Sequence, residues 1–201
     1  GIVAIESTNI RVINSRYRNI TGPALPRTGA NVGNFVQFDR VDGGLIARNV
    51  GKGGDTEDVV SIHRSSNVVV EDNQFEGTNW TSRSSSGIAL SDAGGSNNVA
   101  RRNRLLNAGA VGIFIAGGTN SRIEDNVIVG EARPNSNVAM YVWNQTASPC
   151  SGHSVTGNRI LFRKADGTLA GWWSGGNCGS VLLSGNDLRA PITVSGLRVS
   201  L

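Results

Sequence analysis

The chain has 201 residues, of which 27 are glycine, 38% are hydrophobic, 17% are charged and 5% are aromatic. This composition is rich in turn-forming residues and poor in helix-forming charge, so it favours a single all-β domain over two α/β domains. No run of 18 apolar residues is present, which excludes a transmembrane helix.

The chain is basic. Its formal net charge is +4, and arginine supplies nearly all of the positive charge because Lys52 and Lys164 are the only lysines. Such a chain favours an acidic partner such as a uronate polymer, although arginines that merely cover solvated faces would give the same composition. Nucleic acid is not expected as a partner, because the arginines are spread out without a basic run or a known binding module.

In chain order, the first strands are predicted at residues 1–6, 10–13 and 18–20. No capping segment precedes them, and an uncovered strand edge at the end of a stack invites pairing with other strands. We therefore expect that the chain is part of a longer solenoid, or that another segment or chain covers this end. Residues 21–33 contain two of the five prolines and are predicted to form a long loop.

Residues 58–78 display the repeating unit most clearly. Three short β-rich runs, at residues 59–62, 68–70 and 74–75, are separated by turn-forming residues. None of the runs is long enough for a helix, and valine and isoleucine dominate them. Two corners this tight predict one coil of a solenoid rather than a hairpin.

The corner at Asn73 recurs at irregular spacings of 23 to 34 residues, as expected when loops of different length interrupt a solenoid. The corner positions are Ser15, Asn49, Asn73, Asn103, Asn126, Asn158 and Asn186. Three residues before each corner stand Val12, Ile46, Val70, Ala100, Ile123, Val155 and Leu183, which are all apolar. Two residues after each corner stand Tyr17, Gly51, Phe75, Leu105, Ile128, Ile160 and Leu188, with one glycine among them. These columns predict about seven coils, with an eighth beginning at residues 192–194.

Asparagine suits a repeated corner because its amide donates and accepts hydrogen bonds and because it tolerates the left-handed backbone region. At the strand spacing of ~4.8 Å, stacked amides can bond up and down the stack. This asparagine ladder resembles that of the right-handed parallel β-helix (pectate-lyase-like) superfamily, over essentially the whole chain. The resemblance implies one all-β solenoid domain at residues 1–201. It also implies a substrate on the first sheet, flanked by long third-corner loops, which we expect at 21–33, 51–57 and 77–86.

The two cysteines occupy the same position on consecutive coils. Cys150 and Cys178 each lie eight residues before a corner asparagine. Stacked coils bring Cα atoms within the distance that a disulfide needs, so we predict a Cys150–Cys178 bridge and a secreted or periplasmic location. Two reduced, stacked thiols are the alternative. His153, near Cys150, is expected to be exposed.

Alternation along the first strand of each coil assigns its two faces. The inward residues are predicted to be Val3, Ile5, Val36, Phe38, Val60, Ile62, Ile88, Leu90, Ile113, Ile115, Met140 and Val142. One outward row comprises Ala4, Gln37, Ser61, Ala89, Phe114 and Tyr141, and the other Glu6, Asp39, His63, Ser91, Ala116 and Trp143. Trp172 from the seventh coil is expected to join them. Exposed aromatic rings beside polar groups favour a polysaccharide, so the predicted substrate-binding residues are Glu6, Gln37, Ser61, Phe114, Tyr141, Trp143 and Trp172.

The best candidate for catalysis is Asp39 beside His63 on neighbouring coils, with Arg40 and Arg64 following them. Asp39 would orient His63 as a general base. Arg40 or Arg64 would neutralise a uronate carboxylate and so acidify the C5 proton that a lyase or epimerase removes. A salt-bridged surface is the alternative interpretation of the same residues.

A second acidic group, Asp55, Glu57 and Asp58, resembles the polygalacturonase segment in which paired carboxylates precede an apolar strand. The Gly-His-Gly and Arg-Ile-Lys motifs of that family are absent, as is the Asp-Pro-His-Asp motif of alginate epimerases. No cofactor is expected, although Asp39, Asp55 and Asp58 could supply a calcium site. The leading hypothesis is a lyase or C5-epimerase acting on an acidic glycan. The alternative is a non-catalytic carbohydrate-binding, adhesin-like or tailspike-like solenoid.

Overall fold

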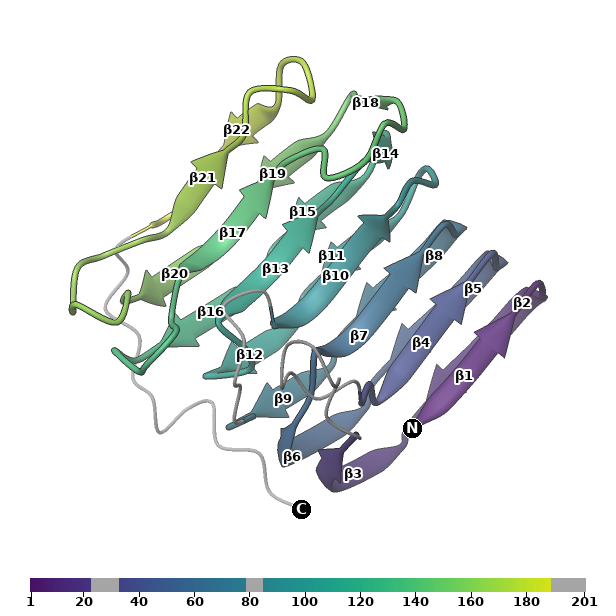
Figure 1. Ribbon diagram of the computed structural model, residues 1–201, viewed down its shortest axis with the longest axis horizontal. Helices are drawn as coiled ribbons and strands as arrows, with labels where there is room; N and C mark the ends of the chain where they lie inside the picture. The colour runs from purple at the N-terminus through teal and green to yellow at the C-terminus, as the bar shows by residue number, and fades with distance from the viewer. Residues whose placement is uncertain (23–32, 79–84, 189–201) are drawn as a thin grey trace.

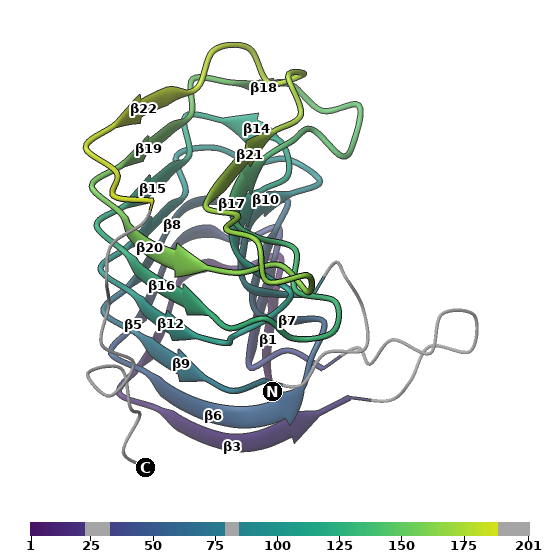
Figure 2. The ribbon, with the colours of Figure 1, turned by 90° about the vertical axis from the view of Figure 1, so that its left-hand side faces the viewer.

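The computed structural model describes residues 1–22, 33–78 and 85–188, and these form a right-handed parallel β-helix (Figures 1 and 2). The predicted eighth coil at residues 192–194 lies outside the described residues, as do the central parts of the predicted loops at 21–33 and 77–86. Consecutive strands run along three faces of the coil, and each face is a parallel sheet of strands from successive coils.

The first sheet has the order β1-β4-β7-β10-β13-β17-β21. Its strands are β1 (Ile2–Ile5), β4 (Val36–Asp39), β7 (Asp58–His63), β10 (Ser86–Asp92), β13 (Val111–Ile115), β17 (Val138–Val142) and β21 (Trp172–Ser174). The second sheet comprises β2 (Thr8–Ile13), β5 (Asp42–Ala47), β8 (Ser66–Glu71), β11 (Val99–Arg101), β15 (Arg122–Glu124), β19 (Ser154–Thr156) and β22 (Leu182–Ser184).

The third sheet comprises β3 (Arg16–Thr21), β6 (Val50–Asp55), β9 (Gln74–Glu76), β12 (Arg104–Leu106), β16 (Val127–Gly130) and β20 (Arg159–Phe162). A small additional sheet pairs β14 (Gly118–Thr119) with β18 (Cys150–Ser151). The prediction of a loop at residues 51–57 was wrong, because most of that segment is strand β6. The glycines there keep the backbone in register with β3, so Gly51 pairs with Tyr17 and Gly54 with Ile20.

The predicted repeat register is confirmed. The column three residues before each corner pairs Val12 with Ile46, and the pairing continues without a break to Val155 and Leu183. The single glycine in the other column has a steric reason. A Cβ atom on Gly51 would collide with the ring of Tyr17, which lies 4.8 Å from the Phe35 ring, centroid to centroid.

The asparagine ladder is continuous over the six predicted asparagines. The side-chain Nδ2 of each of the first five donates to the Oδ1 of the asparagine in the next coil at 2.9 to 3.0 Å. The same Nδ2 donates to a backbone carbonyl in the preceding coil, and the Oδ1 also accepts from the backbone amide of the preceding corner residue. Four hydrogen-bonding positions of a fully buried amide are thereby satisfied.

One of the two reasons for asparagine at this corner was wrong. The corner residues, which are the six ladder asparagines and Ser15, do not adopt positive φ angles, and the residue immediately before each of them does. These preceding residues are Asn14, Arg48, Asp72, Arg102, Asp125, Gly157 and Gly185. The ladder position is therefore selected for its amide hydrogen bonds, whereas the left-handed turn is made by its neighbour.

The inward assignment holds from the second coil onwards and fails in the first. Val36, Phe38, Val60 and Ile62 are fully buried. In β1, however, Ile2 pairs with Val36 and Ala4 with Phe38, so Val3 and Ile5 face outward and are 61% and 53% exposed. Both alternating sets in residues 2–5 are apolar, so alternation alone could not select the correct one.

The predicted disulfide between Cys150 and Cys178 is present, with the two Cα atoms 4.4 Å apart. It joins the sixth and seventh coils at the corner between the first and second sheets. The prediction that His153 is exposed was wrong, because this side chain is only 1% exposed. It lies in a second internal column of polar residues, in which the Ser121 amide donates to His153 Nδ1 at 3.1 Å.

Replacement of one ladder residue tests how far the fold depends on this column. In Asn103→Ala, four buried groups each lose a partner: the Asn73 backbone amide and its side-chain Nδ2, the Val70 carbonyl and the Asn126 Oδ1. These losses should lower the free energy of unfolding by about 2–4 kcal/mol, measured by urea denaturation. Asn137→Ala, at an exposed position, should change it by less than about 0.5 kcal/mol. Equal losses in both variants would contradict a structural role for the ladder.

Candidate functional site

The outer face of the first sheet carries two rows of side chains, as predicted, with four changes in membership. One row comprises Val3, Gln37, Ser61, Ala89, Phe114, Tyr141 and Trp173. The other includes Ile5, Asp39, His63, Asp92, Ala116 and Trp143. Gln37 is half-buried and Ser61 is buried, so these two predicted binding residues lie on the correct face but offer little open surface.

Three predicted positions on this face were wrong. Glu6 does not lie beside Asp39, because the shifted first coil places it next to Arg40. A register shift in β10 places Asp92 opposite His63 and turns Ser91 inward, where it shares a 2.8 Å hydrogen bond with Ser121. Trp172 pairs with Met140 and packs against the core, so the outward-facing tryptophan of β21 is Trp173.

The four predicted catalytic residues do lie together. His63 Nδ1 is 3.0 Å from Asp39 Oδ1. Arg64 holds the same carboxylate through both oxygens, with Nε 3.0 Å from Oδ1 and Nη2 2.9 Å from Oδ2. Arg40 Nη1 lies 3.2 Å from Asp39 Oδ2 and its Nη2 lies 2.8 Å from Glu6. We refer to Glu6, Asp39, Arg40, His63 and Arg64 as the ion-pair cluster.

Charge in the ion-pair cluster favours an ionised Asp39. Burial of the side chain acts to raise the pKa of Asp39, but hydrogen bonds from His63 and Arg64 and the charges of both arginines outweigh it, so the pKa lies below its ordinary value. An ionised Asp39 orients the His63 ring. Arg40 and Arg64 each direct guanidinium N–H groups toward the Asp39 carboxylate, and both side chains remain about two-fifths exposed to solvent.

The predicted aromatic residues also gather, on strands two to four positions away from His63 in the first sheet, which corresponds to ~10–19 Å at the usual strand spacing. Phe114 and Tyr141 stack with ring centroids 4.8 Å apart and planes 3° from parallel. Both are largely buried, which departs from the expectation of exposed rings. Trp143 and Trp173, at 41% and 46% exposure, present the open aromatic surface, and Trp173 meets the Tyr141 and Trp143 rings edge-on.

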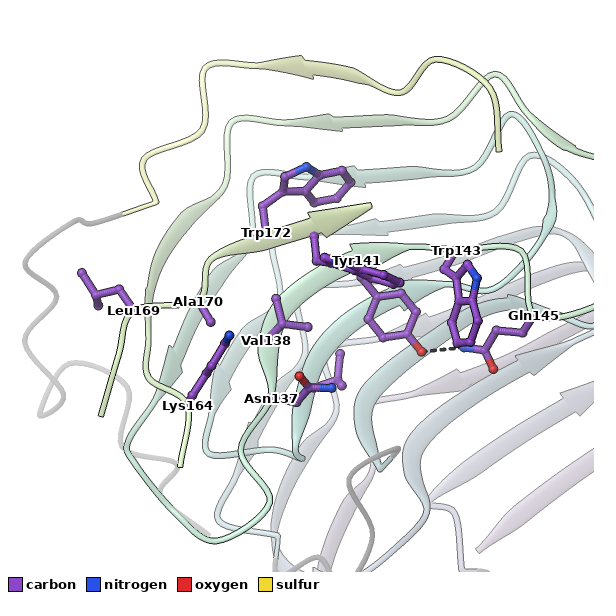
Figure 3. Close-up of a pocket in the computed structure, with 11 residues that line it drawn as sticks. Asn137, Val138, Tyr141, Trp143, Gln145, Lys164, Leu169, Ala170 and Trp172 are labelled. Atoms are coloured by element: carbon purple, nitrogen blue, oxygen red, sulfur yellow. Dashed lines mark hydrogen bonds between the residues drawn. The ribbon is translucent and has the colours of Figure 1, made fainter. Parts of the chain in front are cut away.

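A pocket of about 580 Å³ opens beside these rings. Its lining includes Tyr141, Trp143, Trp172 and Trp173, with Asn137, Gln145 and Lys164 as polar groups. Figure 3 shows Lys164 and Leu169 on one side of the pocket and Trp143 and Gln145 on the other. We refer to this feature as the aromatic pocket.

Tyr141 is held in a fixed position within the aromatic pocket. Gln145 Nε2 donates a 2.6 Å hydrogen bond to its hydroxyl oxygen (Figure 3). Burial raises the pKa of Tyr141, and the negative charges of Asp58 and Asp92 raise it further. The hydroxyl is therefore neutral and remains a hydrogen-bond donor.

The charge of Asp92, which the sequence analysis did not select, acts on Glu57 and Asp58, although Asp92 lies opposite His63, at the other end of β7 from Asp58. Burial raises the pKa of Asp58 well above its ordinary value, and the charges of Glu57 and Asp92 add to the effect, while a 2.6 Å hydrogen bond from Ser86 opposes it. Burial also raises the pKa of Glu57, with a contribution from Asp92.

The suggested calcium site is not formed, since Asp39, Asp55 and Asp58 do not converge. Among residues 1–22, 33–78 and 85–188, the one group of three potential metal-ligating side chains is Cys150, His153 and Cys178. Burial lowers the pKa of His153, and hydrogen bonds involving the Ser121 and Gly118 backbone only partly offset this. Because the Ser121 amide donates to Nδ1, the neutral ring carries its proton on Nε2, 3.4 Å from Cys150 Sγ.

Sequence reasoning missed Asp92, Asn137, Gln145, Lys164 and Trp173. Asp92 faces outward because of the register shift in β10, and no local sequence pattern predicts that shift. Gln145 and Lys164 lie in loops after strands, where alternation says nothing about direction. Trp173 could have been found, because the aligned corner columns place β21 in the same sheet as β17.

The raised pKa of Asp58 predicts a pH-dependent effect of Asp58→Asn. The native state binds the proton more tightly than the unfolded chain, so ionisation costs native stability as pH rises above the unfolded value. The variant should have a higher Tm than the wild type at pH 7–8 and a similar Tm near pH 3, with about 1.4 kcal/mol gained per unit of pKa elevation. Asp166→Asn, at an exposed carboxylate, should show no such gain. A lower Tm for Asp58→Asn at neutral pH would contradict the assignment.

The comparison with known families agrees with this architecture. The chain matches the family described as "Periplasmic copper-binding protein (NosD)" over residues 2–170, which is well over half of its length. No curated protein and no solved structure matches it. No helix in the described parts of the chain could cross a membrane, and the disulfide is typical of an oxidising compartment. The chain therefore belongs to the NosD family and is a periplasmic or extracellular right-handed parallel β-helix.

Proposed function

We propose that the outer face of the first sheet binds a polysaccharide, with the aromatic pocket as its principal sugar subsite. The observation that carries this proposal is the pocket of about 580 Å³ whose open rings, Trp143 and Trp173, stand next to Asn137, Gln145 and Lys164. Aromatic rings cover the apolar faces of a pyranose, while amides and an ammonium group bind its hydroxyls or carboxylate.

An acidic glycan suits the charge around the pocket. Lys164 is the cation in the lining of the pocket, and Arg40 and Arg64 lie farther along the same face. A glycan that lies across the strands of the first sheet would contact the aromatic pocket at one end and the ion-pair cluster at the other. The rigid sheet keeps these groups at a fixed separation, so the protein loses little conformational entropy on binding.

A second candidate function is catalysis on the same glycan by β-elimination or C5 epimerisation. It is favoured by the 3.0 Å contact that orients His63 against an ionised Asp39. In this mechanism His63 removes the C5 proton, Asp39 holds the ring, and Arg40 or Arg64 neutralises the uronate carboxylate through its exposed donors. Arg40 and Arg64 are both paired with carboxylates, as they would also be in a purely structural cluster. Binding without catalysis is therefore the better supported function.

Copper binding, which is part of the family's description, does not follow from the donor atoms of the oxidised chain. The chain has two histidines, two cysteines and one methionine. Met140 is sealed in the core, both cysteines are in the disulfide, and His63 lies between a carboxylate and the guanidinium of Arg64. Copper sites in proteins are built mainly from thiolate, thioether and imidazole donors. The second histidine, His153, is only 1% exposed, so the disulfide-bonded chain offers no open set of such donors.

Binding is tested with polygalacturonate and alginate by isothermal titration calorimetry. Trp143→Ala and Trp173→Ala should each weaken binding about tenfold, because each removes an open ring worth roughly 1–2 kcal/mol. Leu182→Ala, at an exposed residue on the second sheet, serves as the control and should bind as the wild type does. Unchanged affinity in both tryptophan variants would refute the aromatic pocket as the subsite.

Catalysis is tested by following the absorbance of unsaturated products and, separately, C5 inversion in the recovered polymer. If the chain is a lyase or epimerase, His63→Ala should reduce the rate at least about 100-fold, the usual contribution of a general base. Arg122→Ala, on the second sheet, should retain full activity. A wild-type chain that binds the polymer and yields neither product is a non-catalytic carbohydrate-binding solenoid.

A further inference from the structure

One wall of the aromatic pocket is cross-linked to the next coil by the Cys150–Cys178 disulfide. Trp143 and Gln145, which form this wall, lie in the segment between β17 and Cys150. Residues 175–177 lie in the following coil, between β21 and Cys178. The disulfide therefore joins the wall of the pocket to the segment that follows β21, a contact that the proposed function does not use.

Further contacts between these two segments reach the Trp143 side chain. A Cβ atom on Gly175 would collide with the Trp143 ring, so the backbone of this glycine packs directly against the ring. The Asn144 backbone amide donates to Asn177 Oδ1 at 3.0 Å, and Asn177 Nδ2 donates to the Asn144 carbonyl at 2.9 Å. The position of Trp143 therefore depends on where the segment before Cys178 lies.

The noncovalent contacts of this segment are few. Strand β21 has three residues, and within the described residues it pairs only with β17, at the end of the first sheet. The hydrogen bonds between Asn144 and Asn177 are exposed to solvent. Segments held by few, exposed hydrogen bonds open locally at a low cost in free energy. The disulfide is a covalent bond, so it keeps the segment beside Trp143 when these weaker contacts break.

We propose that the Cys150–Cys178 disulfide holds the wall of the aromatic pocket in its binding conformation, and that reduction of the disulfide lowers the affinity of the pocket for the glycan. This inference rests on the proposed function. In the oxidised chain the wall is already ordered, so binding costs little conformational entropy. In the reduced chain the wall opens for part of the time, and the apparent affinity falls with the fraction of molecules in which the pocket is formed.

The disulfide can be reached by an external dithiol at Cys150, which is half-buried on strand β18, whereas Cys178 is only 1% exposed. One thiolate of the dithiol attacks the Cys150 sulfur, the S–S bond breaks, and the electron pair leaves with Cys178. The second thiolate of the dithiol then closes its own disulfide and releases Cys150 as a thiolate. Both protein thiolates take up protons that the dithiol has given up, so the protein gains two thiols.

His153 favours the release of Cys150. Its Nε2, which carries the proton of the neutral ring, lies 3.4 Å from the Cys150 sulfur. An N–H donor beside a departing thiolate stabilises its negative charge, and a more stable thiolate leaves faster. The surroundings of Cys150 are therefore suited to thiol–disulfide exchange.

The test is isothermal titration calorimetry of the full chain with polygalacturonate, in the oxidised form and in a form kept reduced by a dithiol without oxygen. Reduction should weaken binding at least about fivefold. The β-sheet signal in circular dichroism should stay unchanged, and reoxidation should restore the affinity. Cys150→Ser should bind as the reduced wild type does, with or without the dithiol.

Three outcomes would overturn the proposal. Equal affinity in the oxidised and reduced forms would refute it and leave the aromatic pocket as the sugar subsite. Loss of the β-sheet signal on reduction would show that the disulfide maintains the whole fold rather than the pocket wall. An oxidised chain that binds neither polygalacturonate nor alginate would refute the proposed function, and this proposal with it.

Two variants test whether the disulfide acts through Trp143. In Trp143→Ala, reduction should change the affinity by less than about twofold, because the side chain that the cross-link positions is gone. Gly175→Ala should weaken binding by the oxidised chain about as much as reduction does, because its Cβ displaces the Trp143 ring. Ser180→Ala, at an exposed position between Cys178 and β22, is the control and should behave as the wild type in both forms. An equal fall in Trp143→Ala and in the wild type would overturn the role assigned to Trp143.

Discussion

The structure depends on one hydrogen-bonded column, the buried asparagine ladder between the second and third sheets. A buried amide costs free energy unless its donors and acceptors are satisfied, and here each amide is satisfied only when neighbouring coils are in the correct register. A slip of one residue would break these bonds and turn every apolar side chain of the affected strand outward. The column therefore also determines which residues reach the outer face of the first sheet.

That face divides into two chemically distinct halves. The ion-pair cluster lies on the early coils, where Asp39 gathers His63 and two arginines. The aromatic pocket lies on the late coils, where Trp143 and Trp173 remain open beside Lys164. At the start of β7, burial raises the pKa of Asp58 well above its ordinary value.

The repeat was predictable because it rests on residue types that only one environment satisfies. Asparagine occupies the corner from the second coil to the seventh, an apolar residue stands three before the corner in every coil, and the observed pairing follows both. The failures occur where local patterns are ambiguous or interrupted. Residues 2–5 are apolar on both faces, the bulge in β10 moves Asp92 into the place expected for Ser91, and His153 belongs to an internal polar column that its loop position concealed.

The candidate site was only partly predictable for a related reason. Strand residues such as Phe114, Tyr141 and Trp143 follow alternation, so their face could be assigned from the sequence. Their exposure could not, because it depends on packing between rows, as in the stack that covers Phe114. Loop residues such as Gln145 and Lys164 enter the pocket through tertiary structure alone.

A crystal structure of the chain grown with a defined tetrasaccharide of galacturonate tests most directly whether the register of the coils creates a sugar-binding surface at the aromatic pocket. We expect a pyranose ring lying against Trp143 or Trp173, with its carboxylate directed toward Lys164. An oligosaccharide bound elsewhere on the molecule, with the aromatic pocket empty, would contradict the claim.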